Sequence, residues 1–249
     1  MIMIHSYENG KRAESCIEYL GRIERDDTLR IVLLPIPTTR DGKTILNTKV
    51  YINEVLDEII GDTVVCGYGL TDSFCEAVRS RGGRVLDLLN DEDFLVENAE
   101  LTALCTVGIL LTTTEYAPKD VTVGVVGYGR IGKRLTNMLL YLGANVRVYT
   151  TRESTRTDLG ECGVASSKSC CDADMSDIDL LINTAPAAIF SAEKIPHGLR
   201  VIDLASGENF AGLTVEKYPS VPAKMLPKSA GRVWGRAVER FISAACRNA

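Results

Sequence analysis

Histidine is scarce in this sequence, and its cysteines lack the spacing of metal ligands. The chain contains two histidines and eight cysteines, and no two cysteines form a C-x-x-C pair. Structural zinc sites usually take their ligands from close pairs of these residue types, so we expect no metal site. Unpaired cysteines in helices and strands behave as small hydrophobic side chains. Such cysteines are typical of a reduced, cytoplasmic protein, and we predict that location.

The sequence also lacks a basic excess and a long apolar run. Its formal net charge is -5, whereas proteins that bind nucleic acids or membrane surfaces usually carry surplus positive charge. No continuous apolar run reaches the ~18 residues that a membrane-spanning helix needs. The first residues are too few for a signal-peptide core and lack its basic flank. We therefore expect that the protein binds neither nucleic acid nor membrane.

What the sequence does contain is a regular alternation of short β-branched runs with amphipathic stretches, which is typical of parallel sheets covered by helices. We predict an α/β protein with two Rossmann-like, doubly wound domains connected by a long helix over residues 91–114. The N-terminal, substrate-side domain spans 1–92, and the dinucleotide-binding domain spans 93–228. An amphipathic helix over 229–246 could pack back on the first domain. Strands are expected at 1–5, 30–35, 63–66, 84–87, 121–126, 145–150, 180–183 and 200–204, and further helices at 10–20, 51–60, 71–81 and 130–142.

A glycine-rich motif, Gly127-Tyr128-Gly129-Arg130-Ile131-Gly132, lies between a buried strand and an apolar helix. In this context G-x-G-x-x-G predicts a dinucleotide site. Gly127 permits a sharp turn, Gly129 lets the backbone approach a pyrophosphate, and Gly132 lets helix and strand pack closely. The helix N-terminus adds N–H groups and partial positive charge. The alternative is a glycine-rich turn that binds no ligand.

The end of the next strand indicates which dinucleotide binds. An NAD site usually places an acidic residue there to accept a hydrogen bond from the ribose 2′-hydroxyl. Here the strand ends in Thr150, Thr151 and Arg152, and the first acid is Glu153. Hydroxyls and a guanidinium suit a 2′-phosphate better, so we predict that NADPH is preferred over NADH. Arg152 could instead be an ordinary solvated charge.

Two later loops follow strands of the same domain, and ligands of parallel sheets bind at the carboxyl ends of strands. We expect Thr184, Ala185 and Pro186 beside the nicotinamide ribose, and Ser206 near the nicotinamide ring. Ordinary hydrogen bonding within turns is an equally good explanation of Thr184 and Ser206.

Two lysines stand out near the end of the chain, in the segment 221–231. Ser229 can cap the final helix, and Lys228, just before it, could bind a substrate carboxylate with help from the helix N-terminus. Lys224 lies four residues before it, and Arg40, in a polar loop of the first domain, is a matching candidate. The alternative is that these side chains are merely exposed.

Six segments, taken in order, resemble the dipicolinate synthase A-type family over roughly residues 30–245. They are Leu34-Pro35-Ile36-Pro37, Asp93-Phe94 with Asn98-Ala99, the glycine motif, Asn183-Thr184-Ala185-Pro186-Ala187, Ile202-Asp203-Leu204-Ala205-Ser206, and the run from Pro222 to Gly231. The family is built like the D-2-hydroxyacid dehydrogenases, with two Rossmann-like domains around a cleft. The resemblance implies NADP-dependent oxidation of dihydrodipicolinate to dipicolinate in sporulating bacteria, together with a flavoprotein-like B subunit.

On this resemblance, four residues are candidates for the substrate site. Lys224 and Lys228 would hold the two carboxylates of a small dicarboxylate substrate, while Asn98 and Ser206 would orient it. The sequence departs from the family at 100–105, where a proline, an acid and a glycine are replaced, and it lacks the family's glycine-rich N-terminal strand-turn. We further expect a homo-oligomer.

Two other functions remain open. One is a non-catalytic subunit or sensor that binds dinucleotide but has lost its substrate site. The other is a D-2-hydroxyacid dehydrogenase, which would need an arginine after the strand at 200–204 and a histidine as acid–base group. The chain has Ala205 and Ser206 after that strand, and neither His5 nor His197 is suitably placed.

Overall fold

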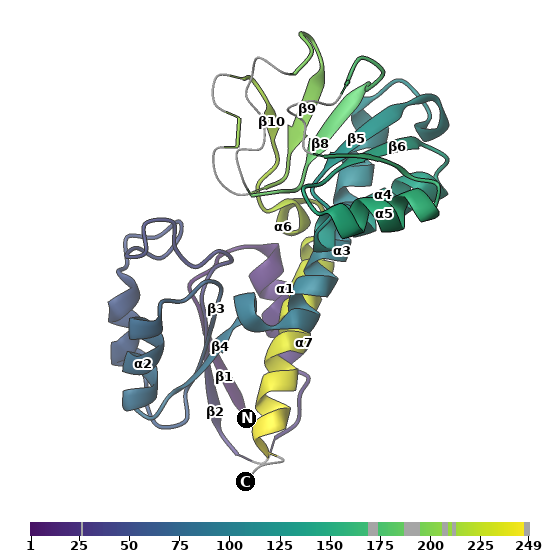
Figure 1. The fold of residues 1–249 in the computed structure, drawn as a ribbon. Helices are drawn as coiled ribbons and strands as arrows, with labels where there is room; N and C mark the ends of the chain where they lie inside the picture. Colours follow the sequence, from purple (N-terminus) through teal and green to yellow (C-terminus); the bar gives the residue numbers. More distant parts are fainter. Residues whose placement is uncertain (26, 169–173, 187–194, 206–208, 211–212, 247–249) are drawn as a thin grey trace. The chain divides into compact units, whose positions relative to one another are not determined.

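The computed structural model describes the chain except residues 26, 169–173, 187–194, 206–208, 211–212 and 247–249 (Figure 1). The chain divides into two compact units. The first unit contains residues 1–98 and 222–249, and the second unit contains residues 99–221. The chain therefore crosses between the units twice, whereas the sequence analysis drew its domain limits at 92 and 228. The C-terminal helix lies in the first unit.

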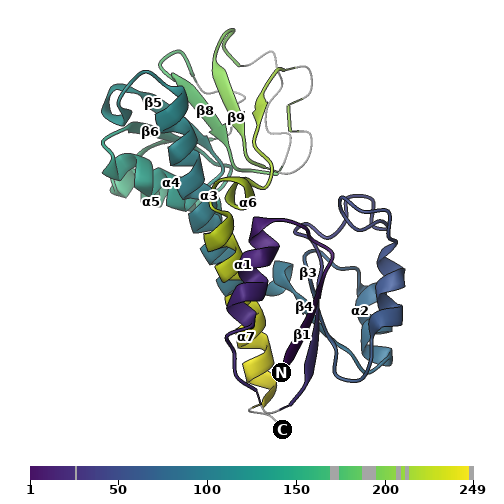
Figure 2. The same ribbon diagram turned by 180° about the vertical axis from the view of Figure 1, so that it is seen from behind.

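The first unit contains a four-stranded parallel sheet with consecutive strand order, β1-β2-β3-β4. Alternating residues along these strands face two different helical layers. On one face, side chains of η1 and α2 join the sheet in one buried cluster, while α1 contacts α7 on the other face (Figures 1 and 2). The elements are β1 (Ile2–Ser6), α1 (Lys11–Leu20), β2 (Leu29–Leu33), η1 (Ile52–Glu58), β3 (Val64–Gly67), α2 (Asp72–Ser80), β4 (Arg84–Asp87), the short helix η2 (Leu88–Asn90) and α7 (Pro227–Cys246).

One connection of the first sheet differs in hand from the other two. All three connections advance in the same direction across the sheet, but α1 lies on one face while η1 and α2 lie on the opposite face (Figures 1 and 2). Connections that advance in one direction on opposite faces of a parallel sheet have opposite hands. The β1–α1–β2 crossover is therefore the exceptional one, since nearly all such crossovers share one hand.

The second unit contains a six-stranded parallel sheet of order β10-β9-β8-β5-β6-β7. The order reverses at β5, which is the switch point of a doubly wound sheet. Two parallel sheets with flanking helices confirm the predicted fold class; among the described strands, only this second sheet shows the reversal. Its elements are η3 (Pro118–Asp120), β5 (Thr122–Val126), α4 (Arg130–Tyr141), β6 (Asn145–Tyr149), α5 (Glu153–Glu161), β7 (Ala165–Ser167), β8 (Leu180–Asn183), β9 (Arg200–Asp203) and β10 (Glu216–Lys217).

The long helix α3 (Glu92–Thr113) begins in the first unit and ends in the second. Among the described residues it is the only helix long and apolar enough to cross a membrane, although no continuous apolar run was found in the sequence. Half of its most apolar window is buried within the protein. Core helices of globular proteins pass the same test, so this observation is weak evidence for a membrane span.

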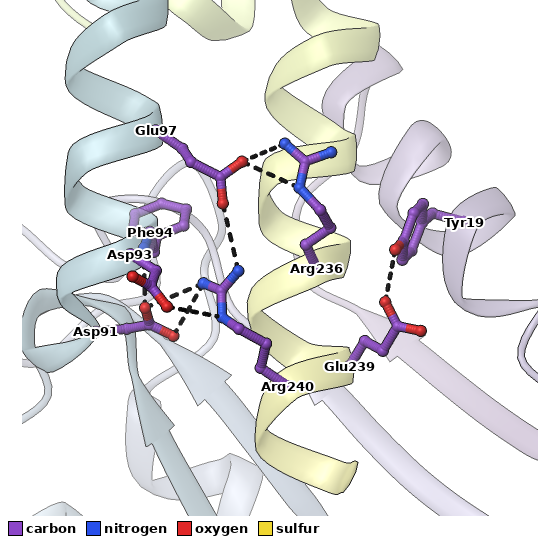
Figure 3. Close-up of polar contacts among 8 residues, drawn as sticks. All are labelled: Tyr19, Asp91, Asp93, Phe94, Glu97, Arg236, Glu239 and Arg240. Carbon is purple, nitrogen blue, oxygen red and sulfur yellow. Dashed lines mark hydrogen bonds and ion pairs between the residues drawn. The ribbon is translucent and has the colours of Figure 1, made fainter. Parts of the chain in front are cut away.

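Ion pairs attach the C-terminal helix to the start of α3 within the first unit. Figure 3 shows Arg236 of α7 paired with Glu97, and Arg240 reaching Asp91, Asp93 and Glu97. The Arg240 guanidinium lies 3.1 Å from Asp91 and 3.3 Å from Glu97. These contacts join residues about 140 positions apart in the sequence, counted from Glu97 to Arg236 and Arg240.

Four cysteines are buried and free, as expected for core thiols: Cys16, Cys66, Cys75 and Cys105. Trp234 of α7 donates a hydrogen bond to the Cys66 sulfur at 3.2 Å. Burial raises the pKa of the Cys66 thiol to about 12. A thiol with so high a pKa has little thiolate at neutral pH and is unreactive.

The end of the chain differs locally from the sequence prediction. A short helix, α6 (Val221–Met225), lies in a segment for which no helix was predicted, and α7 begins at Pro227 instead of 229. Proline is well suited to the first helical position because it has no N–H to leave unpaired. Ser229 therefore lies inside the helix, and the prediction that it caps the helix from outside is wrong.

Candidate functional site

The glycine motif connects β5 to α4 and forms a tight turn. Gly127 has a φ of 86°, a conformation that strongly favours glycine, and its N–H donates to the Tyr149 carbonyl at 2.8 Å. A Cβ on Gly132 would overlap the Gly127 carbonyl and lie 3.0 Å from the Thr184 hydroxyl. Gly132 thus lets α4 pack against the turn, as the motif predicts.

Gly129 has a different environment from the other two glycines. A Cβ built on it would meet nothing within 4 Å, so the space in front of the loop is open. Gly129 is also the N-cap of α4, and among the described residues no side chain caps this helix. The N-terminus of α4, where the helix dipole and N–H groups favour an anion, therefore lies beside an open backbone surface. This arrangement fits a dinucleotide pyrophosphate.

The end of β6 presents hydroxyl and guanidinium groups. Thr150 is buried, and its hydroxyl accepts a hydrogen bond from the Arg152 N–H at 3.4 Å. Arg156 donates from Nη1 to the Thr150 carbonyl at 2.9 Å. Thr151 and Arg152 are exposed. The first carboxylate after the strand, Glu153, is already in α5, a helix that the sequence analysis did not predict.

Tyr128, the second residue of the glycine motif, is half-buried and faces α5. Burial is the main reason that the pKa of its hydroxyl is raised, and the negative charge of Asp158 raises it further. A phenol with a raised pKa remains a neutral hydrogen-bond donor at physiological pH.

Thr184 connects the glycine turn to the end of β8. Its hydroxyl donates to the Val126 carbonyl at 2.8 Å, and its N–H donates to the same oxygen at 2.9 Å. Ala185 lies against the same turn, because a Cβ on Gly127 would be 3.1 Å from the Ala185 methyl. The structure therefore brings together the predicted cofactor residues of 127–132 and 184–186 within the second unit.

Three buried polar residues in this region were not predicted as site residues. Asn183, Asp203 and Asn209 form one hydrogen-bonded group at the carboxyl ends of β8 and β9. The available signal was a polar residue closing an apolar run, as in Leu180-Leu181-Ile182-Asn183 and Val201-Ile202-Asp203. Polar residues at the ends of buried strands usually need partners, and here they find one another.

The residues predicted to bind substrate lie in the first unit, apart from one. Asn98 is on α3, Lys224 is exposed on α6, and Lys228 is exposed in the first turn of α7. The Lys228 carbonyl accepts a hydrogen bond from Ser15 of α1 at 3.0 Å, while its side chain remains in solvent. Arg40 is also exposed. Ser206 lies outside the described residues.

Comparisons with known proteins show which proteins this chain is similar to. Residues 111–195 match the NAD binding domain of D-isomer specific 2-hydroxyacid dehydrogenases. The chain is 25% identical over 232 residues to the A subunit of dipicolinate synthase from Bacillus subtilis (strain 168), covering 85% of this chain and 77% of that protein.

Solved structures show the same fold over the whole chain. The dipicolinate synthase A subunit of Bacillus subtilis superposes with a TM-score of 0.80 at 17% identity, covering 100% of this chain and 97% of that one. The corresponding protein from Bacillus halodurans gives a TM-score of 0.75 at 19% identity, covering 96% of each chain. The resemblance seen in the sequence is thus confirmed: residues 111–195 match an NAD-binding domain of 2-hydroxyacid dehydrogenases, and the chain is similar, over most of its length, to the A subunit of dipicolinate synthase.

Proposed function

We propose that this protein is an NADP-dependent oxidoreductase of the dipicolinate synthase A-subunit type, which oxidises dihydrodipicolinate to dipicolinate. The observation that carries the proposal is the open glycine turn between β5 and α4, in a chain similar to that protein. When bound, a nicotinamide dinucleotide supplies a two-electron hydride acceptor. The substrate ring would lose one hydride and one proton, which leaves it aromatic.

The second unit supplies the groups that would hold the cofactor. The N–H groups of Gly129 and the first turn of α4 would bind the pyrophosphate. Thr151 and Arg152, both exposed at the end of β6, would bind the 2′-phosphate. Arg156 would keep the strand end in place through its bond to the Thr150 carbonyl.

The first unit would supply the groups for the substrate. Lys224 and Lys228 are exposed cations and would each hold one carboxylate by a charge-assisted hydrogen bond. Asn98 and Ser206 would orient the ring. The relative in Bacillus subtilis is named as one subunit of its enzyme, and we propose that this chain likewise works with a B subunit, in the cytoplasm of a sporulating bacterium.

The assay is direct. Purified protein is supplied with dihydrodipicolinate and NADP, with and without a B subunit, and the near-ultraviolet absorbance of NADPH is followed. We expect that absorbance to rise together with dipicolinate. Lys228→Ala should raise the KM for substrate and leave dinucleotide affinity unchanged, because Lys228 is outside the unit that contains the glycine turn. Absence of turnover with both subunits present would refute the proposal.

A second function is favoured by one feature of the sequence. The segment 100–105 has lost the proline, acid and glycine expected from the family, and Leu104 is exposed there. A non-catalytic dinucleotide-binding subunit would tolerate this change. It predicts measurable dinucleotide binding with no turnover in the same assay, and Lys228→Ala would then change neither.

A further inference from the structure

Three buried polar side chains stand at the carboxyl ends of β8 and β9, in an otherwise apolar core. Asn183, Asp203 and Asn209 are 1%, 2% and 3% exposed. Burying a carboxylate is costly unless hydrogen bonds from the protein replace those from water. The hydrogen-bond partners of this carboxylate must compensate the free-energy cost of its burial, so they indicate its role.

Asp203 accepts hydrogen bonds from three residues. Its Oδ1 accepts from Asn183 Nδ2 at 2.8 Å and from the Ala205 N–H at 3.2 Å. Asn209 Nδ2 lies 3.4 Å from Oδ1 and 3.3 Å from Oδ2. All of these described donors are neutral N–H groups. The ionised carboxylate is the form that accepts from all of them, because it has no proton of its own to donate.

The carboxylate therefore determines how the Asn183 amide is turned. With Nδ2 directed to Asp203, the same Nδ2 also donates to the Ala185 carbonyl at 3.1 Å, and Oδ1 accepts from the Ala185 N–H at 3.1 Å. If the amide were flipped, its oxygen would face both the Asp203 carboxylate and the Ala185 carbonyl. Both contacts would be repulsive, so Asp203 fixes the amide, and the amide fixes both polar groups of Ala185.

Ala185 transmits this constraint to the glycine turn. It follows Thr184, whose hydroxyl donates a hydrogen bond to the Val126 carbonyl. The Ala185 methyl itself lies against Gly127, 3.1 Å from where a Cβ on that glycine would be. The Ala205 N–H is held by the same carboxylate. The buried Asp203 carboxylate thus fixes the backbone at Ala185, after β8, through Asn183, and the backbone at Ala205, after β9, directly.

We infer that Asp203 is a positioning residue for the nicotinamide half of the dinucleotide. It acts through Asn183 and Ala205, and it does not touch the cofactor itself. This inference rests on the proposed function, because it requires that 184–186 lie beside the nicotinamide ribose. It separates the site into a nicotinamide part that depends on Asp203 and an adenosine part, at the end of β6, that does not.

The test is Asp203→Asn in the full chain, with two ligands titrated by calorimetry. NADPH spans the whole site, whereas adenosine 2′,5′-bisphosphate contains the adenosine part and one phosphate of the pyrophosphate but no nicotinamide half (AMP replaces it if the wild type prefers NADH). The new amide places an N–H group opposite the N–H group of Asn183 or of Asn209, so at least one of the hydrogen bonds to residue 203 is lost. We expect NADPH affinity to fall at least about tenfold, the effect of losing one charge-assisted hydrogen bond. Affinity for the fragment should change less than about twofold.

Asp179→Asn is the matched control. Asp179 lies just before β8, at the end of the strand opposite to Asn183, and its carboxylate accepts a hydrogen bond from the Thr122 N–H at 2.7 Å. It should leave both affinities unchanged. If Asp203→Asn does not fold, as judged by its thermal unfolding, Asn183→Ala is used instead, because it removes the two bonds to Ala185 and leaves the carboxylate its other donors.

The outcomes are distinct. A selective loss of NADPH affinity supports the inference. Equal weakening of both ligands indicates a general structural role and overturns it, as does unchanged NADPH affinity. A wild-type protein that binds neither dinucleotide overturns the proposed function itself, before any variant is compared.

Discussion

At the scale of single residues, the three glycines of the motif have separate physical roles. Gly127 adopts a positive φ, Gly132 has no room for a Cβ, and Gly129 faces open space. The sequence predicted all three roles from the spacing of the motif. It could not reveal that Thr184 closes against two of these glycines, because that contact joins residues more than fifty positions apart.

The contrast between two of these glycines gives a first prediction. Gly132→Ala should both destabilise the protein, by about 1–3 kcal/mol as overpacking does, and abolish dinucleotide binding, because its Cβ would overlap the Gly127 carbonyl. Gly129→Ala should leave thermal stability nearly unchanged and weaken dinucleotide binding alone. Thermal unfolding and fluorescence titration of both variants decide this. Loss of stability in Gly129→Ala, or unaltered binding in it, would contradict the assignment of the open surface.

A second prediction concerns the choice of cofactor. Arg152→Ala removes an exposed guanidinium at the end of β6. NADPH affinity should fall about tenfold, since a charge-assisted contact to the 2′-phosphate is lost, while NADH affinity stays constant. Lys119→Ala removes an exposed cation of η3, which precedes β5 in the same unit, and is the control that should change neither affinity. An equal loss for both dinucleotides would place Arg152 away from the 2′-phosphate.

At the scale of elements, the sequence predicted those with a strong apolar pattern. The strands β5, β6 and β8 and the helices α3 and α4 were all expected within a few residues of their observed limits. Helix α5 was missed because Leu159 is the only residue that it buries, so it has no apolar face to detect. Residues 52–58 were expected to form an α-helix but form a 3-10 helix, and two short strands, β7 and β10, were too brief to predict.

The attachment of α7 to α3 gives a third prediction, at the same scale. Arg240 is 35% exposed and contacts three carboxylates, so its pairs are screened but not negligible. Arg240→Ala should lower the free energy of unfolding by about 1 kcal/mol, and the loss should shrink at high salt. Arg22→Ala breaks one exposed pair, between Arg22, which follows α1, and Glu18 of that helix, and should have almost no effect. Urea unfolding measures both; equal effects would show that the cluster adds nothing to a single surface pair.

At the scale of the whole molecule, the predicted cofactor residues and most of the predicted substrate residues belong to different units, each built on its own parallel sheet. The cofactor residues all lie in the second unit, whereas Asn98, Lys224 and Lys228 belong to the first. The sequence could predict two α/β units because each has its own alternation of strands and helices. It could not predict the α1 crossover of opposite hand, because hand depends on which face a helix takes, and α1 packs against α7 from the far end of the chain.

The proposed function requires above all that the second unit binds a phosphorylated dinucleotide. The direct measurement is titration of the intact protein with NADPH and with NADH under the same conditions. We predict that both bind and that NADPH binds at least about tenfold more tightly, as one well-placed charged contact allows. NADH binding tenfold more tightly than NADPH, or no binding of either, would contradict the account.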